Sequence, residues 1–175
     1  MHDDAAVFQR QGFGAVLGLR PPLGLLIIDF ANGFADPAVF GGGNILPAMV
    51  AYKNFPGMEG ALYYYFGIPK NPVNEWLVAN HYTKFKSPPD FFTAGGMSAA
   101  IAVVEALKKT NGDTNTNKLI ATMEGMSFET PKGKMTFRKE DHQAMQDMYH
   151  FRIKNDPAFP WGVPELVRVI KAEEL

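Results

Sequence analysis

The chain has 175 residues, of which 46% are hydrophobic and 20% charged, and its formal net charge is −1. This length and composition suit one globular domain, and the balanced charge excludes the clustered positive potential that recruits nucleic acid or an anionic membrane. The absence of cysteine excludes disulfides, thiolate zinc sites and thiol catalysis. No apolar run reaches the about 20 residues of a membrane span, and the acidic N-terminus does not resemble a signal peptide, so we expect a cytoplasmic protein.

Two strands and a short helix are expected in the first 70 residues. The run "LGLLIIDF" at 23–30 is continuously apolar, as in a strand covered on both faces in a parallel sheet. A short helix follows at about 45–55. The aromatic run "GALYYYFGI" at 60–68, bounded by Gly and Pro, predicts a second strand.

The next segment predicts a helix with a clear start. Asn71 suits the N-cap and Pro72 the first helical position, where its missing N–H costs nothing. The helix should run to about Phe85, with a wide buried face that includes Trp76 and Tyr82.

A longer helix is expected at 94–110, ending at Lys108 and Lys109. Its predicted buried stripe consists of Met97, Ala100, Ile101, Val104 and Leu107.

The remaining elements are shorter. A loop at 111–117 leads into a helix stopped by Gly125, and two short strands are expected within 134–156, with Tyr149, Phe151 and Ile153 on one face. A last helix is expected at 163–175.

This alternation of strands and helices favours an α/β fold. We expect a three-layer sandwich with a mostly parallel sheet, flavodoxin-like or Rossmann-like, in a single domain over residues 1–175.

The segment "LLIIDFANGFADPAVFGGGNI" at 25–45 resembles the cysteine hydrolases of the isochorismatase-like superfamily, in particular the N-carbamoylsarcosine amidohydrolases. The resemblance covers about residues 1–45 and implies that Asp29 is a catalytic base. That chemistry needs a thiolate nucleophile, which a chain without cysteine lacks. Asp29 is therefore read as a motif remnant, and the alternative is an acid that caps a nearby loop.

From about residue 43 the sequence resembles another family. The stretches at 56–110 and 123–154, and above all "FETPKGKMTFRKEDHQ", resemble the C-terminal part of ABC-transporter solute-binding proteins of the branched-chain amino acid type. The resemblance implies a two-lobed periplasmic parent that holds its ligand between the lobes. We place a seam between the two resemblances near residues 41–47.

Three functional hypotheses follow. The first is an engineered or fused non-catalytic chimera with at most weak affinity for a small amino-acid-like ligand. The second is a functional solute-binding fragment for branched-chain or aromatic amino acids. The third, an amidohydrolase acting through Asp29, is disfavoured by the missing cysteine.

Candidate ligand-binding residues gather at the start of the long helix. In "FFTAGG", Phe92, Thr93, Ala94 and Gly95 would offer free N–H groups and the positive end of the helix dipole to a carboxylate, and Tyr64 would add an aromatic surface. The alternative is an ordinary helix cap with core phenylalanines.

No metal or other cofactor is expected. The four histidines, His2, His81, His142 and His150, have no metal-ligand spacing, and no glycine-rich segment matches a nucleotide-binding motif. Exposed strand edges or apolar helix faces predict a homodimer.

Overall fold

The computed structural model describes residues 46–174, and they belong to two compact units. Of the described residues, unit 1 contains 46–63 and 147–174, and unit 2 contains 64–146. The predicted strand at 23–30, Asp29, His2 and the proposed seam up to residue 45 lie outside the described residues. The single-domain organisation stays a prediction.

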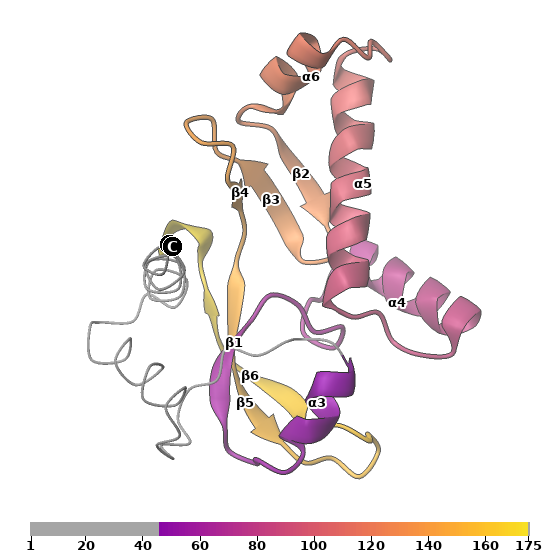
Figure 1. Cartoon of the computed structure of the whole chain (residues 1–175), viewed down its shortest axis with the longest axis vertical. Coiled ribbons are helices and arrows are strands. Elements are labelled where there is room, and N and C mark those ends of the chain that lie inside the picture. Colours follow the sequence, from indigo (N-terminus) through magenta and orange to yellow (C-terminus); the bar gives the residue numbers. More distant parts are fainter. Residues whose placement is uncertain (1–45, 175) are drawn as a thin grey trace, which may run out of the picture. The chain divides into compact units, whose positions relative to one another are not determined.

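Unit 1 holds a short helix and a three-stranded sheet (Figure 1). Helix α3 (Leu46–Tyr52) leads to β1 (Glu59–Leu62), and the chain returns with β5 (Met148–Lys154), β6 (Val163–Ile170) and the 3-10 helix η1 (Ala172–Glu174). The strand order is β1-β5-β6, and both pairings are antiparallel. The strand predicted at 60–68 therefore exists, but it ends at Leu62.

The central strand β5 has the predicted alternation. Tyr149, Phe151 and Ile153 are buried, while Arg152 and Lys154 are exposed. Burial raises the pKa of Tyr149 to about 12, and the negative charge of Asp147 and the nearby Tyr63 add to the shift.

The other face of this sheet is polar. Glu59 of β1 lies opposite Arg152 of β5 and accepts hydrogen bonds from its guanidinium, and Glu59 Oε2 lies 2.9 Å from His150 Nε2. The hydrogen bond from Arg152 is the largest cause that lowers the pKa of Glu59, and the contact with His150 lowers it further. Opposite charges facing each other across neighbouring strands support this pairing register.

The helix predicted at 163–175 is wrong, because residues 163–170 form β6. The segment "VPELVRVI" is rich in β-branched residues, and its backbone groups pair with β5 over the full length of that strand. A register irregularity between His150 and Phe151 interrupts the strict alternation on β6, and this hides the period-2 pattern in the sequence.

Unit 2 contains three helices. Helix α4 (Pro72–Phe85) begins at Asn71, whose side chain accepts the N–H of Asn74, so the predicted cap and bounds are confirmed. Helix α5 (Phe91–Lys109) starts three residues earlier than expected, and α6 (Thr116–Met123) ends just before Gly125, which adopts a φ of 73°.

Unit 2 also contains a three-stranded antiparallel sheet in the order β2-β3-β4. Strand β2 (Ser127–Thr130), which the sequence analysis missed, pairs with β3 (Gly133–Phe137), and β3 pairs with the two-residue β4 (Ala144–Met145). Figure 1 shows α5 running beside β2.

The buried face of α5 differs from the predicted stripe. It consists of Ala94, Ser98, Ala102 and Ala106, whereas Val104 is 48% exposed. Ala102 and Ala106 join a core with Met126, Phe128 and Met135. Small side chains at every fourth position let the bulkier residues of the hairpin approach the helix backbone closely. Ile101 of α5 and Leu119 and Met123 of α6 pack against the same core.

Helix α4 is also more exposed than predicted. Only Asn74 and Leu77 are buried, and Trp76 (60%), Phe85 (57%) and Tyr82 (38%) keep large exposed fractions. The wide apolar face was inferred from spacing alone, and spacing does not reveal whether a neighbouring element covers it.

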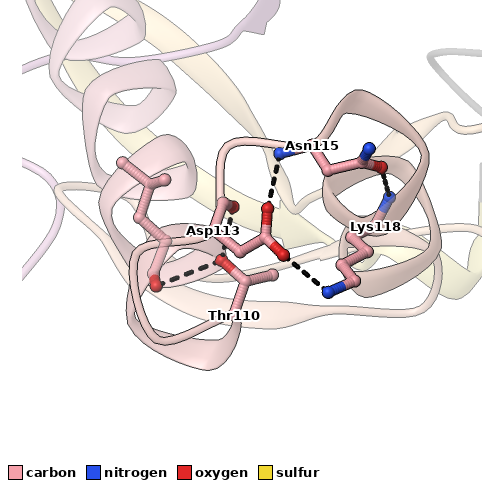
Figure 2. A network of polar contacts seen from close by, with 5 residues as sticks. Thr110, Asp113, Asn115 and Lys118 are labelled. Atoms are coloured by element: carbon pink, nitrogen blue, oxygen red, sulfur yellow. Dashed lines mark hydrogen bonds and ion pairs between the residues drawn. The ribbon is translucent and has the colours of Figure 1, made fainter.

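The predicted loop between α5 and α6 is held by side-chain caps (Figure 2). The Asp113 carboxylate accepts the backbone N–H of Asn115 (2.8 Å) and a bond from Lys118 Nζ (2.6 Å), and Thr110 Oγ1 donates to the Asp113 carbonyl (2.9 Å). The Lys118 ammonium, followed by the Asn115 N–H, lowers the pKa of Asp113. Gly112, at a φ of 82°, provides the backbone turn.

The described helices and sheets confirm the α/β class. All four pairings among residues 46–174 are antiparallel, so the expected mostly parallel sheet is not found in this part of the chain. Among the described helices, α5 alone is long and apolar enough to span a membrane by length and composition, a criterion that core helices also meet.

Two glycine substitutions should change stability in opposite directions. A Cβ at Gly162 would lie 2.9 Å from both Ile153 Cγ2 and the Tyr52 carbonyl carbon, so we expect Gly162→Ala to cost about 1–3 kcal/mol. A Cβ at Gly96, inside α5, meets nothing within 4 Å, so Gly96→Ala should stabilise by about 0.5–1 kcal/mol. Thermal unfolding measures both, and a neutral Gly162→Ala would contradict the close packing.

Candidate functional site

The first two turns of α5 carry four of the five predicted ligand-binding residues. Asp90 is its N-cap, and its Oδ1 accepts the backbone N–H of Thr93 (3.0 Å) and the Thr93 hydroxyl (3.1 Å). The Ala94 N–H donates to the Asp90 carbonyl (3.0 Å). The N–H groups of Thr93 and Ala94, which we expected to be free for an anion, are therefore bonded within the protein.

The remaining side chains of this turn differ in accessibility. Phe92 is 67% exposed, and its ring lies edge-on to that of Phe91 with centroids 5.0 Å apart. Thr93 and Gly95 are half-buried, and Ala94 is fully buried. Only Phe92 and Thr93 thus present a side chain that a solute could contact here.

Tyr64 belongs to a buried polar network that precedes and opens α4. Its hydroxyl donates to Asn74 Oδ1 (2.7 Å), and Asn74 Nδ2 donates to the carbonyls of Phe66 (3.0 Å) and Pro69 (2.9 Å). Tyr64 is 1% exposed and Asn74 2% exposed. The phenol therefore has an internal partner, and its described contact organises the 64–74 segment.

The structure places all five predicted residues in unit 2. Two important residues were missed, namely Asp90 and Asn74. An acid directly before an apolar helical run is a recognised N-cap signal, so "PPDFF" contained the information needed for Asp90. Nothing in the local sequence marks Asn74 as buried, because its partners come from a turn without a regular pattern.

A separate hollow of about 470 Å³ lies in unit 2, and none of the five predicted residues lines it. Its walls are Val73, Ile101, Glu105, Ser127, Phe128, Glu129 and Lys134. The described residues contain no group of three or more His, Asp or Glu side chains able to hold a metal ion.

Comparisons with known proteins identify the family. The model of the periplasmic binding protein family matches residues 34–158, which is more than half of the chain. The chain therefore belongs to the periplasmic binding proteins, an α/β family of two-lobed proteins with a flavodoxin-like sheet. No curated protein matches the chain.

Solved structures of similar proteins agree with this family membership. An ABC-type branched-chain amino acid transporter protein from Rhodopseudomonas palustris is 60% identical, with a TM-score of 0.75, and the match covers 89% of this chain and 41% of that one. A second R. palustris protein, an ABC-transporter solute-binding protein in complex with 3,4-dihydroxybenzoic acid, is 28% identical (TM-score 0.59, 67% and 31% covered). A leucine-binding protein from Thermotoga maritima shares the fold at 20% identity (TM-score 0.56, 69% and 32% covered). The chain thus spans less than half the length of these relatives.

These findings correct several expectations. The family match starts at residue 34 and crosses the proposed seam at 41–47, and no comparison supports a hydrolase-like segment or a chimera. The family is periplasmic, so the cytoplasmic expectation has no support. Periplasmic binding proteins bind ligands and are not enzymes, which agrees with the prediction that the chain is no enzyme.

The Tyr64–Asn74 network should be a main source of stability in unit 2. Asn74→Ala removes the side chain that bonds the Tyr64 hydroxyl and the carbonyls of Phe66 and Pro69, so we expect a loss of about 2–4 kcal/mol, and Tyr64→Phe should cost about 1–2 kcal/mol. Asn80→Ala is the matched control, because Asn80 is exposed on the same helix, and it should change stability by less than about 0.5 kcal/mol. Urea unfolding followed by circular dichroism measures all three. Equal midpoints for Asn74→Ala and Asn80→Ala would contradict the role of the network.

Proposed function

We propose that the chain binds a small amino acid as part of an ABC-type solute-uptake protein. The observation that carries this proposal is the 60% identity to a protein described as an ABC-type branched-chain amino acid transporter, over 89% of this chain. Membership of a non-enzymatic ligand-binding family supports it. Because the chain spans 41% of that relative, the activity of the whole protein is part of the proposal.

The start of α5 suits a ligand that carries one positive and one negative group. Asp90 places a carboxylate beside the Thr93 hydroxyl, and a carboxylate attracts an ammonium group. The positive end of the α5 dipole lies at the same turn and favours an anion. A zwitterionic amino acid has both groups, and the exposed Phe92 ring offers its side chain an apolar surface.

In this arrangement the five predicted residues have different roles. Phe92 and Thr93 contact the solute, Gly95 adds no side chain beside them, and Ala94 packs α5 into the core. Tyr64 positions the segment that leads into α4 through its bond to Asn74. Asp90 is a sixth residue of the proposed binding site.

An aromatic acid is the second candidate ligand. It is favoured by the 28% identical R. palustris protein that was solved with 3,4-dihydroxybenzoic acid. A benzoate lacks an ammonium group, so the Asp90 carboxylate would repel it rather than hold it.

Titration calorimetry with leucine, phenylalanine and 3,4-dihydroxybenzoate tests the proposal. We expect saturable heat with an amino acid and at least about tenfold weaker binding in Thr93→Val, since a hydrogen bond to a charged group contributes about 1.5–3 kcal/mol. Thr83→Val is the control, because Thr83 is an exposed threonine of α4 whose hydroxyl also bonds within its own helix, to the Ala79 carbonyl. Absence of saturable heat with all three solutes would refute the proposed function.

Asp90→Asn separates the two ligand classes. Asparagine caps a helix as well as aspartate does, so the fold should be kept while the negative charge is lost. We expect weaker binding of amino acids and stronger binding of 3,4-dihydroxybenzoate. The same change in affinity for both ligands would show that the Asp90 charge does not contact the ligand.

A periplasmic location and a homodimer complete the proposal. The location is supported by the family. The homodimer rests on apolar side chains that remain exposed in the described residues, among them Trp76, Val103 and Ile120.

A further inference from the structure

The loop that follows α5 begins with a chemically labile pair of residues, Asn111 and Gly112. The side-chain amide of an asparagine reacts with the backbone nitrogen of the next residue, and glycine favours this reaction because it has no Cβ to obstruct that nitrogen. A Cβ built on Gly112 meets nothing within 4 Å, and both residues are exposed. The pair is therefore open to water and sterically unobstructed.

The other asparagines of the described residues lack this arrangement. Residues 46–174 contain eight asparagines, and Asn111 alone among them precedes a glycine. Asn71 precedes a proline, which has no N–H, and the other six precede residues with a Cβ. In this part of the chain, spontaneous reaction of an asparagine is thus expected first at Asn111.

The reaction is a ring closure followed by hydrolysis. The Gly112 nitrogen loses its proton and attacks Asn111 Cγ, the Cγ–Nδ2 bond breaks, and ammonia leaves with the proton that water carries to it. Water then opens the cyclic imide, and the nitrogen regains a proton. Opening at Cγ gives aspartate, whereas opening at the backbone carbonyl carbon gives isoaspartate, in which the main chain runs through Cβ and Cγ. No electrons are transferred, and water is the co-reactant.

The C-cap of α5 opposes the ring closure. Asn111 has a φ of 53°, and its N–H donates to the Lys108 carbonyl (3.2 Å). The Gly112 N–H donates to the Leu107 carbonyl (2.8 Å). These two bonds form the Schellman motif, which ends a helix at a left-handed residue. In that conformation the Gly112 nitrogen points away from the Asn111 side chain, and turning it toward Cγ breaks its bond to Leu107.

Side-chain contacts hold the same cap from the loop (Figure 2). Thr110 Oγ1 lies within hydrogen-bond distance of the Leu107 carbonyl (3.2 Å) and of the Asp113 carbonyl (2.9 Å). The Asp113 carboxylate is in turn bonded to the first residues of α6 and their cap. Because these contacts lie on both sides of Asn111 in the sequence, ring closure requires the last turn of α5 to open.

We infer that Asn111 is a deamidation site whose reactivity is controlled by the C-cap of α5. Either product adds a carboxylate at the negative end of the α5 dipole, which is unfavourable. Isoaspartate also lengthens the backbone by one atom, so the Schellman motif cannot form again. Deamidation therefore loosens the connection between α5 and α6 as the protein ages. The inference does not depend on the proposed ligand.

Peptide mapping of the aged full chain tests the inference. The wild type is incubated in native buffer and in urea, and fragmentation of its tryptic peptides separates Asn111 from Asn32, which also precedes a glycine and lies outside the described residues. We expect aspartate and isoaspartate at position 111, formed at least about tenfold faster in urea because the cap is fully open only in the unfolded chain. Equal rates in the folded and unfolded chain, or no reaction at Asn111 in either, would overturn the inference.

Thr110→Val tests the control by the cap. The change removes the hydroxyl that contacts the Leu107 and Asp113 carbonyls, so deamidation of the folded protein should be about two- to tenfold faster. Thr83→Val is the matched control, because the Thr83 hydroxyl bonds within α4, and its rate should equal that of the wild type. Circular dichroism verifies that both variants are folded. Equal rates in the two variants would show that the cap does not control the reaction.

Asn111→Gly tests the consequence of the reaction. Glycine suits the left-handed position after a helix, so the cap is kept while the reactive amide is lost. We expect the thermal midpoint of the wild type to fall on ageing and that of Asn111→Gly to fall less. The same fall in both proteins would contradict the loosening of the α5–α6 connection.

Discussion

The packing of α5 against the β2–β3 hairpin is the contact on which unit 2 depends. Ala102 and Ala106 meet Met126, Phe128 and Met135 in one core, and Ile101 of α5 packs against it while partly buried. Because alanine adds little volume, the distance between helix and hairpin is set by the sheet residues, and a larger residue at either alanine would push the hairpin away. The remaining features of the unit, the loop to α6 and the start of α4, are arranged around this close contact.

The sequence predicted a structural feature correctly where residues adjacent in the chain determine that feature. The cap at Asn71, the end of α6 at Gly125 and the buried face of β5 are determined by neighbouring residues in the sequence, and all three were predicted correctly. The burial of α5 and of Trp76 depends on which distant element covers each face, and the predictions were wrong for Ala100, Val104 and Trp76, which are exposed. Ile101 of the predicted stripe does pack against the core. Strand β6 was missed because the irregularity beside His150 and Phe151 interrupts its alternation, and because Pro164 resembles a helix start.

The candidate site was predictable only in part for the same reason. The sequence placed the start of α5 three residues too late, and it did not show that Asp90 already bonds the N–H of Thr93. It marked Tyr64 as an accessible aromatic residue, whereas the phenol is buried against Asn74. The resemblance to solute-binding proteins was correct, and the hydrolase resemblance rested on a short stretch that the family match partly includes.

One side chain connects two parts of unit 2 that are 60 residues apart in the sequence. The side-chain oxygen Oδ1 of Asn71 accepts the Asn74 N–H and caps α4, and its side-chain nitrogen Nδ2 donates to the Pro131 carbonyl in the turn between β2 and β3. Pro131 is among the most buried residues described, so packing as well as the hydrogen bond restrains this turn. The Asn71 side chain therefore couples the start of α4 to the β2–β3 turn, so that a change in the tilt of α4 displaces this turn as well.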